Sequence, residues 1–192
     1  MAKKLSEMTL EELWALFPII LKPHDPCWKT WYREEALLLN AKLPAETVRI
    51  AHIGSTAVET IQAKPIVDIL VEMPLGYDLG SLTAVLADCG YRCMSRSGTR
   101  MSFNKGYTES GFAEKVFHLH LRYAGDHDEL YFRDWLLVHP EDAKNYETIK
   151  LSLWKRYEHD RDGYTAQKSG IVSELTEKAR AAYKGRYEER GE

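Results

Sequence analysis

Cysteine is scarce in this chain. Three of the 192 residues are cysteines, Cys27, Cys89 and Cys93, and no two of them form a CxxC pair. An odd number of separated cysteines excludes a fully paired disulfide framework and a zinc ribbon, and it favours a reducing compartment.

Long apolar runs are missing as well. No segment approaches the roughly 18 apolar residues that a membrane-spanning helix requires. The N-terminal stretch MAKKLSEMTLEELW has no apolar core of the kind found in signal peptides. We therefore expect a soluble, cytoplasmic protein with no membrane partner.

A strong charge of either sign is also absent. The 26 basic and 29 acidic side chains nearly cancel, and the formal net charge is −3. Proteins that bind nucleic acid electrostatically usually have a basic excess, so we expect no nucleic-acid partner.

Internal repeats and low-complexity runs are absent, and 44% of the residues are hydrophobic, which suits a single domain over residues 1–192. Apolar periodicity predicts an α+β fold, with a helical N-terminal segment (about 1–44), a mixed-sheet core (about 45–125) and a helical tail (about 126–192). The expected strands lie near residues 48–53, 66–71, 100–104 and 116–123. The expected helices lie near residues 9–18, 26–43, 55–62, 79–89, 140–159 and 164–189.

A Gly-Ser pair stands between the first expected strand and the helix after it. Gly54 allows the backbone to approach a ligand closely, and Ser55 can cap the helix and donate its hydroxyl. Free N–H groups at a helix N-terminus attract anions, so Gly54, Ser55 and Thr56 form a candidate phosphate cradle. The pair also suits an ordinary tight turn with a helix cap, and the sequence leaves both interpretations open.

Asp68 interrupts the apolar strand that follows. A carboxylate in a buried strand is costly unless it binds a cation or forms an ion pair, for example with Lys64. Position 70, where a second carboxylate would share a metal ion with Asp68, is leucine. Glu72 is about 13 Å further along the strand, too far to bind the same ion, and we expect it at a solvated strand end.

Two histidines alternate with apolar residues on a later strand. His118 and His120 share one strand face and can converge on a ligand. Their nitrogens suit Zn, Ni, Fe or Mn, while contact with an anion and a structural role remain alternatives. Other side chains that can complete an anion pocket are Lys64, Arg100, Lys105, Arg122, Arg133 and, four apart on one helix, Tyr164 and Lys168. The alternatives are an ordinary ion pair with Asp134 for Arg133 and a surface position for Tyr164 and Lys168.

Several of these motifs together resemble the GrpB family. They are His52–Val58 (HIGSTAV), Lys64–Val71 (KPIVDILV), His118–His120 (HLH) and Phe132–Leu136 (FRDWL). The resemblance covers about residues 20–180 and implies a nucleotidyltransferase-like fold of the DNA polymerase β type. It also implies that Gly54 and Ser55 hold a triphosphate and that Asp68 binds Mg²⁺ or Mn²⁺. The chain departs from that superfamily at Leu70, and it has His118 and His120 where a further carboxylate is expected.

Two main functions follow from these residues, beside a third and weaker one, another metal-dependent hydrolase or transferase with the same fold. The first is a metal-dependent nucleotidyltransferase in which Asp68, His118 and His120 are catalytic and bind the metal. Its substrate-binding residues would be Gly54, Ser55, Thr56, Lys64, Arg100, Lys105, Arg133, Tyr164 and Lys168. The alternative is a non-catalytic module that binds a nucleotide, a CoA-type ligand or another phosphorylated small molecule. The sequence does not decide between an enzyme and a binding module.

Overall fold

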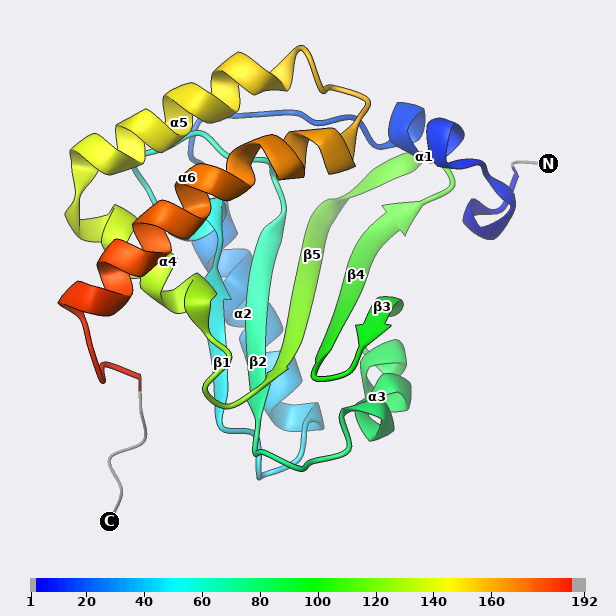
Figure 1. Cartoon of the computed structure of the whole chain (residues 1–192). Helices are drawn as coiled ribbons and strands as arrows, with labels where there is room; N and C mark the ends of the chain where they lie inside the picture. The colour runs from blue at the N-terminus through cyan, green and yellow to red at the C-terminus, as the bar shows by residue number, and fades with distance from the viewer. Residues whose placement is uncertain (1–2, 188–192) are drawn as a thin grey trace.

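The computed structural model describes residues 3–187. Five strands form one mixed sheet in the order β1-β2-β5-β4-β3 (Figure 1). The central pair, β2 and β5, runs parallel, and the other neighbours run antiparallel. The strands are β1 (Arg49–Ile53), β2 (Val67–Met73), β3 (Arg92–Ser97), β4 (Arg100–Thr108) and β5 (Gly111–Tyr123).

Helices lie on both faces of this sheet. α2 packs behind β1 and β2 in the view of Figure 1, whereas α4, α5 and α6 lie on the opposite side. The α-helices are α1 (Leu10–Leu16), α2 (Cys27–Lys42), α3 (Leu82–Asp88), α4 (Asp128–Val138), α5 (Pro140–Trp154) and α6 (Arg161–Ala182). Short 3₁₀ turns lie at Leu5–Glu7, Ser55–Ala57 and Leu79–Ser81. This arrangement confirms the α+β class, the mixed sheet and the helical C-terminal segment. None of the helices between residues 3 and 187 combines the length and apolarity needed to cross a membrane.

One sheet face carries the largest apolar core. Side chains alternate along a strand, so Val67, Ile69 and Val71 of β2 point to the same side as Leu119 and Leu121 of β5. They are fully buried under α2 and α3. Removing this much apolar surface from water is the main stabilising contribution to the sheet.

The opposite face is polar along the two central strands. It carries Asp68 on β2 next to His118 on β5, and Glu72 on β2 next to Arg122 on β5. Between them, Leu70 packs against β1 and against Leu130 of α4. Leu70 therefore separates Asp68 from Glu72 on β2, whereas His118, His120 and Arg122 form an uninterrupted polar row on β5.

The segment after Gly54 differs from the prediction. The expected helix over residues 55–62 is only a 3₁₀ turn at Ser55–Ala57. Tertiary contacts hold the rest of the segment in a non-helical path: Val58 and Ile61 pack against α4 and α5, and Ala63 pairs with the backbone of Lys22. A local sequence pattern cannot predict these contacts, because the partners are far away along the chain.

Two further elements differ from expectation. β3 was not expected, because its six residues are exposed at the sheet edge and show no apolar alternation. The last helix begins at Arg161 and ends at Ala182, and the expected end near residue 189 lies outside the described residues.

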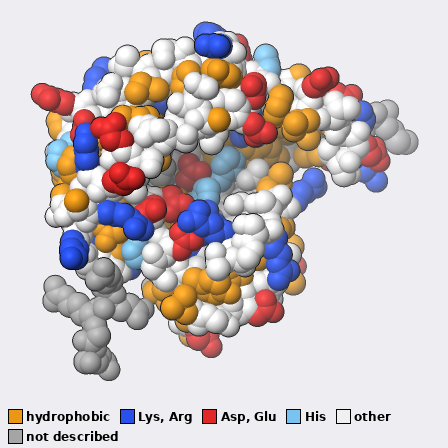
Figure 2. Space-filling view, in the orientation of Figure 1, with side chains coloured by type: hydrophobic (Ala, Val, Ile, Leu, Met, Phe, Trp, Pro, Cys, Tyr) orange, Lys and Arg blue, Asp and Glu red, His pale blue; other side chains and the backbone are white. Residues whose placement is uncertain are grey.

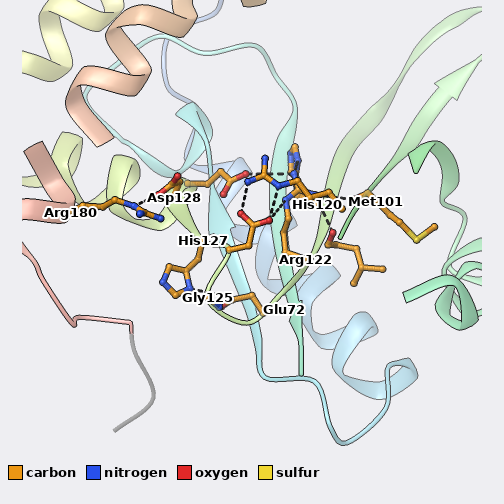
Figure 3. Close-up of polar contacts among 12 residues, drawn as sticks. Glu72, Met101, His120, Arg122, Gly125, His127, Asp128 and Arg180 are labelled. Atoms are coloured by element: carbon orange, nitrogen blue, oxygen red, sulfur yellow. Dashed lines mark hydrogen bonds and ion pairs between the residues drawn. The ribbon is translucent and has the colours of Figure 1, made fainter. Parts of the chain in front are cut away.

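The prediction for Glu72 was wrong. This carboxylate is 1% exposed, although it lies near the end of β2. Its Oε1 accepts a hydrogen bond from the backbone N–H of Gly125 (3.2 Å) and contacts Nδ1 of His127 (2.9 Å), as Figure 3 shows. Arg49 on the neighbouring strand lies 2.9 Å from Oε2. The turn that follows β5 folds over this end of β2 and excludes water from it.

Candidate anion-binding site

A large cavity opens on the polar face of the sheet. Its volume is about 940 Å³, and it extends from α1 and β4 to the Gly54–Ser55 turn and the facing sides of α5 and α6. In Figure 2 this face is hollowed near its centre, where histidine and acidic side chains gather. Of the residues selected from the sequence, those lining the cavity are Gly54, Ser55, Thr56, Lys64, Asp68, Lys105, His118, His120, Tyr164 and Lys168.

The Gly54 position requires a residue without a side chain. Gly54 has a φ of 70°, in the left-handed region that favours glycine. A Cβ atom at this position would overlap Oδ2 of Asp68. The turn and the carboxylate of Asp68 therefore lie in direct contact and belong to one site.

Ser55 faces a buried lysine from a distant part of the chain. Nζ of Lys150, on α5, donates a hydrogen bond to Oγ of Ser55 at 3.1 Å and another to the carbonyl oxygen of Gln62. Sequence reasoning missed Lys150. One signal was available, since Lys150 shares a helix face with Ala143 and Tyr146, and a lysine among buried positions is unusual.

Three lysines of the cavity are poorly solvated. Burial, together with neighbouring cations, lowers the pKa of Lys64 to about 7 and that of Lys150 to about 7. Burial lowers the pKa of Lys168 to about 8. The acidic side chains that line the same cavity in the described structure are Asp68 and Asp162, so its wall carries more basic than acidic groups. This electrostatic imbalance favours an anionic ligand.

Tyr164 adds a free polar group to this wall. Its side chain is 1% exposed, and its hydroxyl has no hydrogen-bond partner among the described residues. The Nζ atoms of Lys64 and Lys168 lie 5.7 and 4.4 Å from the centre of its ring. A buried hydroxyl without a partner is costly, and a ligand that accepts a hydrogen bond from it would remove this cost.

Asp68 is the centre of a second group of side chains. Its Oδ1 lies 3.4 Å from Nδ1 of His118 and 3.3 Å from Nε2 of His120. Burial by itself would raise the pKa of Asp68, but the hydrogen bonds from the two histidines outweigh it and hold the pKa far below its usual range. Burial lowers the pKa of His118. The cluster therefore holds a carboxylate anion beside the Gly54 turn.

The cluster does not fit a metal site of the kind that the resemblance implies, in which a second carboxylate would share the ion with Asp68. Leu70, at the position of the second acid, is fully buried against β1 and α4. Between residues 3 and 187, no group of three or more His, Cys, Asp or Glu side chains is arranged to hold a metal ion. A single ion bound by Asp68 stays a prediction.

The other residues predicted to bind substrate form ion pairs elsewhere in the structure. Arg100 forms two hydrogen bonds with Asp126, and Arg133 binds Asp134 and the carbonyl oxygen of His52. Neither arginine lines the cavity, so the structure does not bring them together with the Gly54–Ser55 turn. Lys105 reaches the cavity wall, but its Nζ lies 2.8 Å from Oε1 of Glu35, which neutralises much of its charge.

The family is now evident from comparison with known proteins. The family model described as "GrpB protein" matches residues 18–178. The chain belongs to the GrpB family. A UPF0157 protein of Pseudomonas aeruginosa is 38% identical over 163 residues, which cover 83% of this chain and 67% of that protein.

Two proteins named GrpB are also similar. The glutamate-rich protein GrpB of Alkalihalophilus pseudofirmus is 34% identical over 164 residues, covering 82% of this chain and 93% of that protein. The crystal structure of the conserved protein GrpB from Enterococcus faecalis superposes with a TM-score of 0.74 at 26% identity, covering 85% of this chain and 99% of that one. The fold described above is therefore that of a solved GrpB structure.

Proposed function

We propose that this GrpB protein binds a phosphorylated small molecule, with a nucleotide as the first candidate. The phosphates would lie between the Gly54–Ser55 turn and the lysines of α5 and α6. The observation that carries the proposal is the convergence of Lys64, Lys150 and Lys168 on one cavity with few acidic partners.

The electrostatics of these lysines support an anion as the ligand. Without a ligand, burial lowers their pKa values to about 7 for Lys64 and Lys150 and to about 8 for Lys168, so Lys64 and Lys150 are incompletely protonated at neutral pH. A phosphate group between them would favour the protonated forms by opposite charge. Binding is then expected to take up protons, which an uncharged ligand would not cause.

The uncharged donors would complete the site. Oγ of Ser55 accepts a hydrogen bond from Lys150, so its own proton would be directed to a phosphate oxygen in place of the neighbouring hydroxyl of Tyr146. The hydroxyl of Tyr164 has no other partner in the described structure. Both can donate to phosphate oxygens, and hydrogen bonds to a charged acceptor are worth about 1.5–3 kcal/mol.

Transfer of a nucleotidyl group is a second candidate function, favoured by the anionic Asp68 in contact with the turn. It ranks below binding because Leu70 replaces the second acid. Incubation with each nucleoside triphosphate and Mg²⁺ or Mn²⁺, followed by detection of released pyrophosphate, tests it. Release by the wild type that is lost in Asp68→Asn would support transfer, and no release would leave binding alone.

Calorimetric titration tests the binding proposal. The ligands are ATP, CTP, GTP, UTP, CoA and inorganic pyrophosphate, and the variants are Lys168→Gln and Lys178→Gln. Both lysines are on α6, but Lys178 is exposed and pairs with Glu174 outside the cavity. We expect Lys168→Gln to weaken binding about tenfold, equivalent to about 1.4 kcal/mol. The control Lys178→Gln should change it less than about twofold.

Two results would contradict the proposal. One is the absence of binding by every phosphorylated ligand to the wild type. The other is an equal effect of the two lysine variants, which would place the bound ligand outside the cavity.

A further inference from the structure

The histidines beside Asp68 each have a second ring nitrogen, and both of these nitrogens have partners. The partner of His120 is an arginine on the same strand, and the partner of His118 is a tyrosine that contacts the first residue of α6. They decide which nitrogen of each histidine carries the proton, because a neutral imidazole has one donor and one acceptor.

The partner of His120 is Arg122, two residues further along β5. Nη1 of Arg122 donates to the carbonyl oxygens of Met101 and Leu121, both at 3.1 Å, and these bonds hold the guanidinium in place. Its Nη2 lies 3.3 Å from Nδ1 of His120 (Figure 3). A guanidinium has only donors, so Nδ1 of His120 must accept and its proton must be on Nε2. That proton points to Oδ1 of Asp68.

The partner of His118 is Tyr107 on β4. Nη2 of Arg161 donates to the hydroxyl oxygen of Tyr107 at 2.8 Å, and that oxygen lies 2.8 Å from Nε2 of His118. A tyrosine hydroxyl carries its proton at neutral pH, and because the Tyr107 oxygen already accepts from Arg161, that proton is available for a hydrogen bond to Nε2. The proton of His118 is then on Nδ1, which also faces Oδ1 of Asp68.

We infer that Arg122 and the Arg161–Tyr107 pair are positioning residues that hold His120 and His118 as opposite tautomers, both donating to Asp68. The two ring nitrogens nearest the carboxylate then have no lone pair for a metal ion. The histidines organise the carboxylate and do not bind Zn, Ni or Fe. The inference concerns the protein without ligand, so it stands or fails independently of the proposed phosphate binding.

The consequence for metal binding follows from the same bonds. To bind a metal through Nε2, His120 would have to move its proton to Nδ1, opposite the N–H of Arg122. His118 would likewise have to move its proton to Nε2, opposite the hydroxyl of Tyr107. For His120 this change would turn a hydrogen bond into a contact between two donors. For His118 the hydroxyl of Tyr107 would have to turn its own proton away and accept from Nε2 in addition to Arg161.

Nitrogen NMR of the histidine rings tests this inference. Long-range ¹H–¹⁵N correlation spectra of the ¹⁵N-labelled full chain distinguish a protonated from an unprotonated ring nitrogen. We expect His118 to carry its proton on Nδ1 and His120 on Nε2 at pH 7.5, with no change on addition of equimolar Zn²⁺. A different tautomer or a doubly protonated ring at either residue would overturn the inference. So would loss of the protons facing Asp68 when Zn²⁺ is added.

Two variants test whether Tyr107 determines the tautomer of His118. Tyr107→Phe removes the donor to His118, so the Nδ1-protonated fraction of His118 should fall while His120 is unchanged. Tyr123→Phe is the matched control, because its hydroxyl donates to the carbonyl oxygen of Tyr77, away from the cluster. An unchanged His118 in a folded Tyr107→Phe variant would contradict the positioning role of Tyr107.

Discussion

Two features of position 54 require glycine: its backbone is in the left-handed region, and a Cβ atom there would overlap the carboxylate of Asp68. Gly76 shares only the first, since its φ is 84° and a Cβ atom added there would meet no other atom within 4 Å. Gly76→Ala should therefore cost about 1–2 kcal/mol, from backbone conformation alone. Gly54→Ala should cost at least about 1 kcal/mol more, because Asp68 must move. Urea unfolding of both variants measures the difference, and equal losses would contradict the contact.

Tyr164 is expected to contribute to ligand binding but not to stability. Tyr164→Phe removes a buried hydroxyl that has no partner among the described residues, so the free energy of unfolding should stay the same or rise by up to about 1 kcal/mol. Affinity for the phosphorylated ligand should fall. Tyr123→Phe removes a hydroxyl that is hydrogen-bonded, and it should destabilise by about 0.5–1.5 kcal/mol. Thermal unfolding and calorimetry separate the two patterns, and a destabilised Tyr164→Phe variant with normal affinity would contradict the expectation.

At the scale of elements, the packing of β2 against β1 and α4 determines which side chains position 70 tolerates. Leu70→Asp introduces the second acid that the sequence resemblance led us to expect, but it places a charge in a fully buried apolar cluster with Ala51, Ile53 and Leu130. We expect a loss of at least about 3 kcal/mol in the free energy of unfolding and no gain of metal binding. Leu70→Met, which conserves volume, should cost less than about 1.5 kcal/mol. Thermal unfolding followed by circular dichroism compares the variants. A stable Leu70→Asp protein that binds Mg²⁺ would contradict the expectation, because it would show that the apolar cluster around position 70 accommodates a charge.

The elements themselves followed the sequence where the pattern was local. The capping box at Thr9 begins α1, and the carboxylate of Glu12 accepts from the Thr9 backbone N–H at 2.7 Å. The alternation around His118 and His120 predicted their shared strand face correctly. Local pattern failed for residues 55–62 and for β3, where pairing and packing with distant segments determine the backbone.

At the scale of the whole molecule, pH should act on stability and on binding in opposite directions. An ordinary lysine has a pKa near 10.5, whereas the three cavity lysines have values of about 7, 7 and 8 in the fold. Between about pH 7 and pH 9 the unfolded chain therefore binds more protons than the native protein, and the free energy of unfolding should rise with pH. Affinity for a phosphorylated ligand should fall over the same range, because the lysines lose their protons.

Unfolding in urea and calorimetric titration at pH 7, 8 and 9 measure these two trends. Titration in two buffers of different ionisation enthalpy also measures the proton uptake expected on binding at neutral pH. Affinity that does not change with pH, without proton uptake, would show that the lysines do not face the ligand.

The sequence by itself determined the α+β class, the placement of Gly54 next to a strand, and the shared face of His118 and His120. These features depend on neighbours within a few residues, which periodicity and turn chemistry describe well. Tertiary structure alone decided that Lys150 meets Ser55 from 95 residues away, that Glu72 is buried, and that Arg100 and Arg133 pair elsewhere. Tertiary structure also decided which side chains contact Nε2 of His118 and Nδ1 of His120, the ring nitrogens that face away from Asp68. Charges and hydrogen bonds act through space, so their partners are known only when the chain is folded.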